Sequence, residues 1–254
     1  MLNQIVTEQI FAWLVVFSRI GSAFMVMPTI GDAFVPARAR LLISLAISIL
    51  VTPVLVPSLP KSPESPFLLL ILLNSEIIIG LFLGLIPRIM MGALEVAGMI
   101  IGTTTGLANA SVFNPALASQ GSLPGALLGW LGLLLIFATD LHHLLITAVV
   151  DSYGVFKPGS PLPIHDMTMT IIRVTGDSFN LGARMAAPFL IVGLMFALAL
   201  GILAKLTPQI QVFFIFTSSQ IMLGLALFAL TLSAMMTFWL TYLEDSIIRF
   251  LARG

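Results

Sequence analysis

Residues 67–86 read FLLLILLNSEIIIGLFLGLI and contain one charged side chain, Glu76. A helix needs about 20 mostly apolar residues to cross the hydrocarbon core of a bilayer, so this stretch predicts a membrane helix. Its two glycines, Gly80 and Gly84, are four positions apart and therefore lie on one helix face. Small residues at this spacing let a second helix backbone approach closely. The stretch thus predicts a membrane helix that packs against another helix.

The composition of the whole chain supports the same class of protein. Hydrophobic residues make up 59% of the 254 residues and charged residues 9%, and the mean hydropathy is +1.11. A soluble domain carries roughly a quarter charged residues, so this surface must meet lipid or other apolar protein. Eleven basic residues balance eleven acidic ones without a basic run, which argues against nucleic-acid binding. The absence of cysteine excludes disulfides, thiolate zinc sites and cysteine nucleophiles.

Seven apolar segments recur along the chain, separated by proline-rich and polar stretches. The pattern predicts an all-α, polytopic membrane helical protein. We expect an interruption at Pro87 and a long polar connection over 151–180. The last segment is long enough to bend, to leave the membrane, or to contain a break near Ser218 and Ser219. The predicted segments are 9–27, 41–56, 67–86, 90–110, 126–150, 185–206 and 212–243.

The distribution of basic residues predicts the orientation, provided that all seven segments cross. Inside loops then hold eight basic residues and outside loops only Lys61 and Lys205, with Arg19 left inside the first segment. Because basic residues favour the cytoplasmic side, the C-terminus is predicted to be cytoplasmic. Residues 1–10 lack the basic start of a signal peptide, so we expect the first segment to be retained. The eight inside residues are Arg38, Arg40, Arg88, Lys157, Arg173, Arg184, Arg249 and Arg253.

Glycines at four-residue spacing recur in other segments. One row joins Gly98, Gly102 and Gly106, and a softer row joins Gly193 and Gly201 through Ala197. Such rows predict close helix packing, either within one chain or between subunits. The residues predicted to pack are Gly80, Gly84, Gly98, Gly102, Gly106, Gly193 and Gly201.

Three acidic residues, Glu76, Glu95 and Asp140, lie within apolar segments. Burying a charge at membrane depth is costly, so such residues usually face a partner or water and often mark a pathway. Asp140 precedes His142 and His143, which allows either a proton relay or, the interpretation we favour, a structural hydrogen bond near a helix end. A proton-coupled secondary transporter using Glu76 or Asp140 is therefore the alternative function, although the inverted repeats of many transporters are not evident.

Enzymatic and cofactor motifs are not found. The chain has no HExxH pair, no GxSxG elbow, and no GxGxxG or Walker loop. A catalytic metal site normally needs three protein ligands, and the spacing of Asp140, His142 and His143 matches no such motif. We therefore predict no catalytic residue, no cofactor and no metal site. An intramembrane enzyme stays a weaker alternative.

The loop 111–125 reads SVFNPALASQGSLPG and carries no charge. A loop facing bulk water usually carries some charge, whereas irregular backbone at membrane depth must be buried in protein or line a cavity. The loop is accordingly either a short external connection or a segment inside a pore.

Taken in order, several stretches resemble the FliR family of the flagellar type III export gate and its SctT-like injectisome counterparts. The resemblance spans nearly the whole chain. It departs at Gln211, Phe216, Ser218 and Gln220, where the family commonly has asparagine, glycine, proline and lysine. The matching stretches are Val35-Pro36 with Arg38 and Arg40, EIIIGLFLG over 76–84, Phe113-Asn114-Pro115 with Gln120, Asp140-Leu141-His142-His143 with Ser152-Tyr153 and Pro158, and 201–206 with Pro208-Gln209 and Val212-Phe213-Phe214.

The resemblance implies a helical hetero-oligomeric export gate of packed hairpins, in the bacterial inner membrane at the flagellar basal body. The partners would be FliP-like and FliQ-like subunits and an FlhB-like protein, and the substrates unfolded exported proteins. The helices would be largely raised out of the bilayer. The resemblance also implies a FliP-like part over 1–182, a FliQ-like hairpin over 183–254, and a pore plug within 111–125. The plug residues would be Ser111, Val112, Phe113, Asn114, Pro115, Leu117, Gln120 and Leu123.

Overall fold

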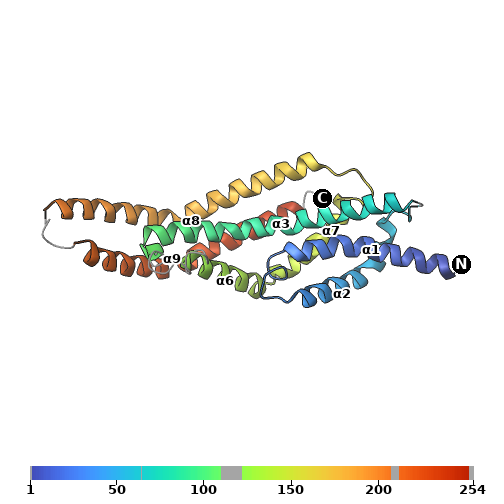
Figure 1. Cartoon of the computed structure of the whole chain (residues 1–254), viewed down its shortest axis with the longest axis horizontal. Helices are drawn as coiled ribbons and strands as arrows, with labels where there is room; N and C mark the ends of the chain where they lie inside the picture. The colour runs from blue at the N-terminus through green and yellow to red at the C-terminus, as the bar shows by residue number, and fades with distance from the viewer. Residues whose placement is uncertain (1, 64, 110–121, 207–211, 252–254) are drawn as a thin grey trace. The chain divides into compact units, whose positions relative to one another are not determined.

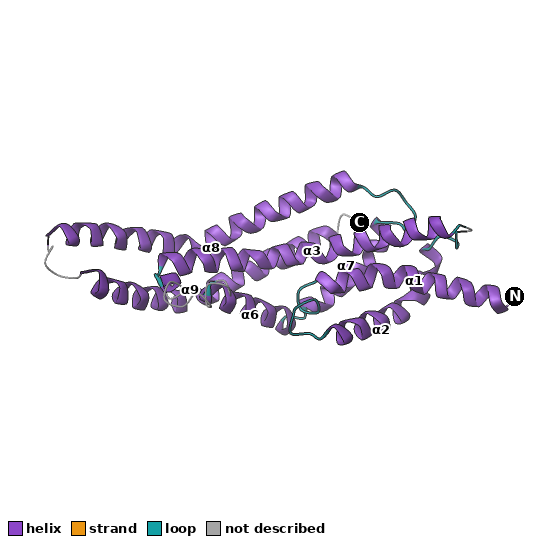
Figure 2. Cartoon of the chain, viewed as in Figure 1, coloured by secondary structure: helices purple, strands orange, loops and turns teal. Residues whose placement is uncertain are grey.

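The computed structural model describes residues 2–63, 65–109, 122–206 and 212–251. Within these ranges every regular element is a helix and none is a strand (Figure 2). The predicted all-α fold class is therefore confirmed. In chain order the elements are α1 (Leu2–Val26), α2 (Ala37–Leu55), η1 (Val56–Ser58), α3 (Pro66–Thr104), η2 (Leu107–Asn109), α6 (Leu123–Ala138), α7 (Leu141–Val155), α8 (Ile164–Leu206) and α9 (Val212–Leu251).

Several helices are long and apolar enough to cross a membrane. In the part of the chain that the structure describes there are five such helices, and the broken pair α6–α7 is a sixth candidate. This agrees with a polytopic membrane protein. The five stretches are Glu8–Val26, Ala37–Ser58, Pro66–Thr104, Ile164–Leu206 and Ser218–Arg249.

The predicted interruption at Pro87 is wrong, because the segment 67–86 and residues 90–104 of the segment 90–110 both lie on α3, a helix of 39 residues. Proline removes one backbone hydrogen bond from a helix, yet helices packed among neighbours in membranes tolerate it. At 1.5 Å per residue α3 is about 58 Å long, roughly twice the 30 Å of a hydrocarbon core. The seven apolar segments are thus not seven separate helices. The cytoplasmic orientation of the C-terminus was derived by assuming seven crossings, so it stays a prediction.

The polar connection predicted over 151–180 is largely helical. α7 continues to Val155, and α8 begins at Ile164. The charged side chains of Asp166 and Arg173 lie on the exposed side of α8, whereas Met167 is buried. Polarity excludes a stretch from lipid but does not prevent it from forming an amphipathic helix.

The predicted segment 126–150 is broken, because α6 ends at Ala138 and α7 begins at Leu141. The break contains Asp140, whose φ of 57° is left-handed. Aspartate is one of the few non-glycine residues that adopt this conformation. By contrast, α9 continues through Ser218 and Ser219, so the break that was one of three alternatives for this segment is not present.

The first of two compact units comprises Met1–Ile89, Ile136–Val174 and Leu243–Gly254. In it α1 and α2 pack side by side (Figure 1). α2 buries hydroxyl groups along one face, and each donates a hydrogen bond of 2.6–2.7 Å to the carbonyl four residues earlier. These polar side chains, Ser44, Ser48 and Thr52, are therefore satisfied within their own helix. α1 buries an apolar face of Val15, Val16, Ile20, Ala23 and Phe24.

The connection between α1 and α2 is held by charged groups. Asp32 accepts the backbone N–H of Thr29 at 2.9 Å and forms an ion pair with Arg88 of α3. Arg40 donates to the carbonyls of Val35 at 3.0 Å and Asp32 at 3.1 Å. Two of the basic residues that the sequence assigned to inside loops thus hold this turn.

The second unit comprises Met90–Leu135 and Thr175–Tyr242. Trp239 of α9 is fully buried in it, and its Nε1 donates to the carbonyl of Met90 at 3.1 Å. Gln220, also on α9, donates through Nε2 to the carbonyl of Thr104 at 2.7 Å. The part of α3 in the second unit, residues 90–104, is therefore hydrogen-bonded to α9 at both of its ends.

The predicted division into parts 1–182 and 183–254 has its boundary inside α8, which continues from Ile164 to Leu206. The two compact units follow tertiary contacts and each joins stretches distant in sequence. The division into FliP-like and FliQ-like parts stays a prediction.

Candidate functional site

A buried ion pair lies within the first unit. Arg19 is about two turns before the end of α1, and Glu76 is one turn before the glycine pair of α3. The guanidinium donates from Nε to Glu76 Oε2 at 2.6 Å and from Nη2 to Oε1 at 3.0 Å. Both side chains are 0% exposed. The two parallel bonds form the bidentate arrangement in which arginine binds a carboxylate most strongly.

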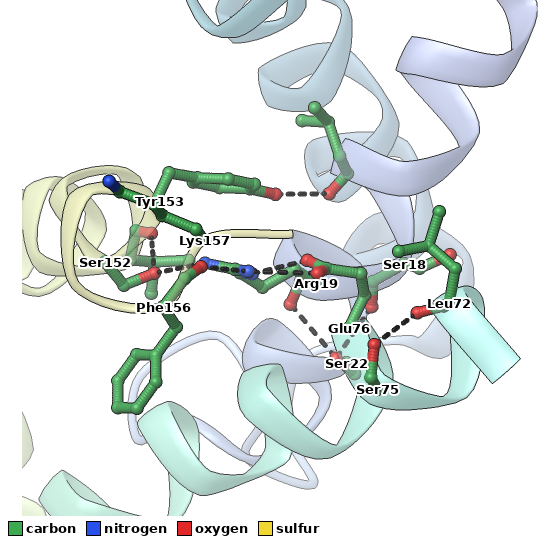
Figure 3. Close-up of polar contacts among 12 residues, drawn as sticks. Ser18, Arg19, Ser22, Leu72, Ser75, Glu76, Ser152, Tyr153, Phe156 and Lys157 are labelled. Atoms are coloured by element: carbon green, nitrogen blue, oxygen red, sulfur yellow. Dashed lines mark hydrogen bonds and ion pairs between the residues drawn. The ribbon is translucent and has the colours of Figure 1, made fainter. Parts of the chain in front are cut away.

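The segment around the end of α7 completes the surroundings of Arg19 (Figure 3). Nη1 donates to Ser152 Oγ at 3.2 Å, and Nη2 donates to the carbonyl of Phe156 at 2.8 Å. The ring of Tyr153 lies against the guanidinium, with 3.9 Å between Arg19 Cζ and the ring centroid. With the two bonds to Glu76, four of the five guanidinium N–H donors are engaged.

This arrangement holds three helices together at one point. Two charges inside an apolar protein are tolerated only when they are paired and their remaining hydrogen-bonding capacity is met. Here Arg19 supplies bonds to α3 and to the end of α7 while standing on α1. The site therefore acts as a polar junction that sets the relative register of α1, α3 and α7 within the first unit.

The geometry does not favour Glu76 as a proton carrier. A carrier must reach water or a second titratable group, whereas Glu76 is fully buried and both of its oxygens are bound to Arg19. Asp140, the other residue proposed for a relay, is 79% exposed and lies beside His143 instead. The transporter alternative, which uses Glu76 or Asp140, is therefore less favoured for Glu76 and stays untested for Asp140.

Sequence reasoning predicted Glu76 as a site residue and left Arg19 without a role. The available signal was that Arg19 and Glu76 are both single charges within apolar runs, and each needs an opposite partner. Ser152 and Tyr153 contributed only to the family resemblance. Their part in the junction depends on where α7 ends, which the sequence pattern did not indicate.

The glycines of the first half of α3 face α1. A Cβ atom added to Gly80 would overlap Ser22 Oγ and the carbonyl oxygen of Arg19, and one added to Gly84 would overlap the carbonyl oxygen of Ala23. The two glycines therefore let α1 and α3 approach closely, next to the Arg19–Glu76 pair. Their absent side chains allow the short distances of that pair.

The remaining predicted glycines differ in their surroundings. Gly98 lies against the backbone of Gly125, and a Cβ added to Gly102 would lie 3.4 Å from Ser122 Cβ. A Cβ on Gly193 would meet Thr104 at 3.2 Å, whereas Gly201 has nothing within 4 Å. Gly106 lies beyond the end of α3, where its φ of 77° requires the freedom of glycine.

The other predicted polar residues lie at the surface of the chain. Glu95 is exposed on α3. Asp140 and His143 are exposed at the start of α7, with 3.7 Å between His143 Nδ1 and Asp140 Oδ1, and His142 is half-buried. Of the predicted plug, Leu123 is 73% exposed at the start of α6. The remaining plug residues, Ser111, Val112, Phe113, Asn114, Pro115, Leu117 and Gln120, lie outside the described residues.

The fold and this junction define a class: an all-α, polytopic integral membrane protein whose helices are joined by a buried arginine–glutamate pair. Comparisons with known proteins narrow the class. The family described as bacterial export proteins, family 1, matches residues 10–246. The chain belongs to this family, which includes the FliR proteins that its sequence resembles.

Three relatives illustrate the range of similarity. The flagellar biosynthetic protein FliR of Caulobacter vibrioides is 36% identical over 231 residues, covering 91% of this chain and 92% of that protein. FliR of Bacillus subtilis is 29% identical over 205 residues, covering 80% and 78%. The Yop proteins translocation protein T of Yersinia pestis is 26% identical over 218 residues, covering 84% and 82%.

Proposed function

We propose that this protein is a subunit of the flagellar type III export gate and forms, with FliP-like and FliQ-like subunits, the channel through which unfolded flagellar proteins cross the bacterial inner membrane. An FlhB-like protein joins this gate at the basal body. The chain acts without catalysis, by packing and by closing the channel. The observation that carries the proposal is the length of its helices combined with their exposed apolar faces.

Helix length argues against conventional crossing. α3, α8 and α9 have 39, 43 and 40 residues, which correspond to about 58–65 Å at 1.5 Å per residue. A hydrocarbon core is about 30 Å thick, and even a helix tilted by 40° would have only about 39 Å of its length inside it. About a third or more of each helix must therefore extend beyond the hydrocarbon region. This supports a gate whose helices are raised out of the bilayer.

The exposed side chains of the first half of α8 support the proposal that partner subunits bind there. Met169 and Ile172, in the part of α8 that belongs to the first unit, are 49% and 59% exposed, and their spacing of three places them on one face. The same half carries Asp166 and Arg173, which would be costly in lipid. An apolar stripe on a helix that also bears charges is suited to contact with another protein. FliP-like and FliQ-like subunits are the proposed occupants.

The flagellar assignment rests on the relatives. The C. vibrioides protein named for flagellar biosynthesis is 36% identical, whereas the Y. pestis protein named for Yop translocation is 26% identical. Both cover more than four fifths of each chain. The higher identity favours the flagellar over the injectisome system.

The loop 111–125 is proposed as the pore plug. Its sequence carries no charge. In the described residues on either side of 110–121, Gly102 lies next to Ser122 and Gly98 lies against the backbone of Gly125, within the second unit. An uncharged loop with apolar side chains among small polar ones can seal a channel against ions and still be displaced by a polypeptide.

Native mass spectrometry of the tagged protein, purified gently from its own membrane, tests the gate assignment. We expect one copy of this chain together with several copies of two smaller membrane proteins. A monomer or homodimer without such companions would overturn the assignment. In that case neutralising Asp140 becomes the next experiment, since it should abolish flux through a proton-coupled transporter.

The plug assignment has a separate test. Deletion of residues 111–120 should raise ion leakage through the assembled complex while the complex still forms. A matched deletion within 158–162, which lies in the connection between α7 and α8 and spares Phe156, should leave leakage unchanged. Unaltered conductance in an assembled complex with the loop deleted would contradict the plug role without affecting the subunit assignment.

A further inference from the structure

Three potential metal ligands gather at the break between α6 and α7. One ligand atom from each of Asp140, His142 and His143 lies within 4.8 Å of the other two. The rings of His142 and His143 have centroids 4.0 Å apart, and His143 Nδ1 is 3.7 Å from Asp140 Oδ1. We name these three residues the histidine cluster. The Arg19 junction uses none of them.

The backbone gives Asp140 an unusual position for a residue before a helix. An aspartate there normally has extended backbone and caps the first turn by accepting N–H bonds. Asp140 instead has φ 57° and ψ 14°, and its side chain makes no capping hydrogen bond. Its carboxylate is therefore not occupied by the helix and lies beside the imidazole of His143. Strained backbone of this kind persists where the surrounding structure imposes it and is common at functional sites.

His142 provides an independent observation. Its Nδ1 is buried and has no hydrogen-bond partner, although a buried ring nitrogen normally has one. The ring is held between Phe137, with centroids 5.1 Å apart, and His143. The imidazole is thus positioned by packing, with hydrogen-bonding capacity left unmet. A bound cation near the cluster would account for a polar group that nothing else in its surroundings satisfies.

We propose that the histidine cluster binds one divalent first-row transition metal ion, with Zn²⁺ as the reference ion, through two imidazoles and one carboxylate. Zn–N and Zn–O distances of 2.0–2.2 Å place neighbouring ligand atoms of a tetrahedral site about 3.3 Å apart. The 3.7 Å between Asp140 and His143 is close to that value, and rotation of exposed side chains closes the rest. The fourth position would be left to water. Two imidazoles with one carboxylate are an established ligand set for zinc and for non-haem iron.

The sequence predicted no metal here because Asp-x-His-His matches no ligand motif. Consecutive histidines on a regular helix point about 100° apart, so they rarely share an ion. Here both histidines lie in the first turn of α7 with ring centroids 4.0 Å apart, and the left-handed Asp140 directly precedes that helix. The ion would tie the break residue to the first turn of α7 and so stiffen the start of the helix that also carries Ser152.

The test is Zn²⁺ titration of the full-length chain, purified through a tag without histidines and followed by calorimetry. The chain has three histidines and no cysteine, so the third histidine supplies a matched control. We expect one equivalent to bind. H142A, H143A and D140N should each weaken binding by about tenfold or more, because even loss of a residue that only orients a metal ligand typically costs that much. H165A, at an exposed position of α8, should bind as the unaltered chain does.

Electron paramagnetic resonance with Cu²⁺ gives a readout that does not depend on the folding of variants. Nitrogen hyperfine structure from two imidazoles in the unaltered chain is the expected result. Binding that is equal in the D140N, H142A and H143A chains and the unaltered chain, or that falls equally in H165A, would overturn the proposal. So would a failure of the unaltered chain to bind either ion.

Discussion

Arg19 and Glu76 are 57 positions apart in sequence, yet Arg19 Nε lies 2.6 Å from Glu76 Oε2 and both side chains are completely buried. The pair joins α1 to α3, and Ser152 and Phe156 tie the end of α7 to the same guanidinium. One charged side chain therefore determines how three helices of the first unit meet. Loss of this buried pair should therefore reduce stability more than loss of an exposed charge on the same helix.

Replacing Glu76 by glutamine should strongly destabilise the first unit. The substitution keeps the shape of the side chain but leaves Arg19 charged and buried, and loss of one partner from a buried pair costs about 3–5 kcal/mol. Thermal unfolding of the purified protein in detergent measures the loss. Glu95→Gln makes the same chemical change at an exposed position of the same helix and should be nearly neutral. Equal stability of the two variants would contradict the role of the pair.

Removing both charges together should harm the protein less than removing one. In the double variant Arg19→Met with Glu76→Leu no unpaired charge is left, and apolar replacements of buried pairs are often neutral or stabilising. The bonds to Ser152 and Phe156 are still lost, so recovery should be partial. A double-mutant cycle on unfolding temperature measures this, and a double variant less stable than both single variants would disprove the interpretation.

The ring of Tyr153, rather than its hydroxyl, should matter to the junction. The hydroxyl donates a long bond of 3.4 Å to the carbonyl of Val16, whereas the ring lies 3.9 Å from Arg19 Cζ. Tyr153→Phe keeps the cation–π contact and should cost less than about 1 kcal/mol. Tyr153→Leu loses it and should cost about 2 kcal/mol or more. Unfolding temperatures of the two variants test this prediction. A lower unfolding temperature for Tyr153→Phe than for Tyr153→Leu would contradict it.

Alanine at Gly80 or Gly84 should push α1 away from α3. The added Cβ would overlap backbone atoms of α1, which cannot move aside as a flexible side chain can. We expect a loss of about 1–3 kcal/mol, the usual cost of overpacking. Gly92, on the same helix, has nothing within 4 Å, so Gly92→Ala should be neutral or slightly stabilising through helix propensity. Equal effects at all three positions, measured as unfolding temperatures, would show that helix propensity alone is at work.

Gln220 should stabilise the base of the predicted plug. Its Nε2 donates to the carbonyl of Thr104, the last residue of α3 before the loop. Gln220→Leu removes one hydrogen bond, worth about 1 kcal/mol, and should lower the unfolding temperature slightly. In the assembled gate it should also raise ion leakage. Gln9→Leu, the same change at an exposed position of α1, is the control and should alter neither quantity.

The all-α membrane class, the family and the approximate positions of the apolar helices could be predicted from the sequence. These properties depend on composition and on the length of apolar runs, since a chain in lipid must satisfy its backbone hydrogen bonds within helices. The residues EIIIGLFLG, over 76–84, already indicated both a polar residue and a close-packed face. The positions at which helices continue or end were harder to predict from the sequence. Pro87 looked like an interruption but lies inside the long helix α3. The polar stretch 151–180 looked like one long connection, whereas only residues 156–163 separate α7 from α8.

The pairing of Arg19 with Glu76 and Tyr153 was decided by tertiary structure alone. A single charge in an apolar run signals that a partner exists, but which residue serves depends on the rotation and register of helices distant in sequence. The same holds for Asp140, whose left-handed backbone at the start of α7 brings its carboxylate beside two imidazoles. Composition and spacing act along the chain, whereas ligand sets and ion pairs require atoms brought within a few ångströms by packing.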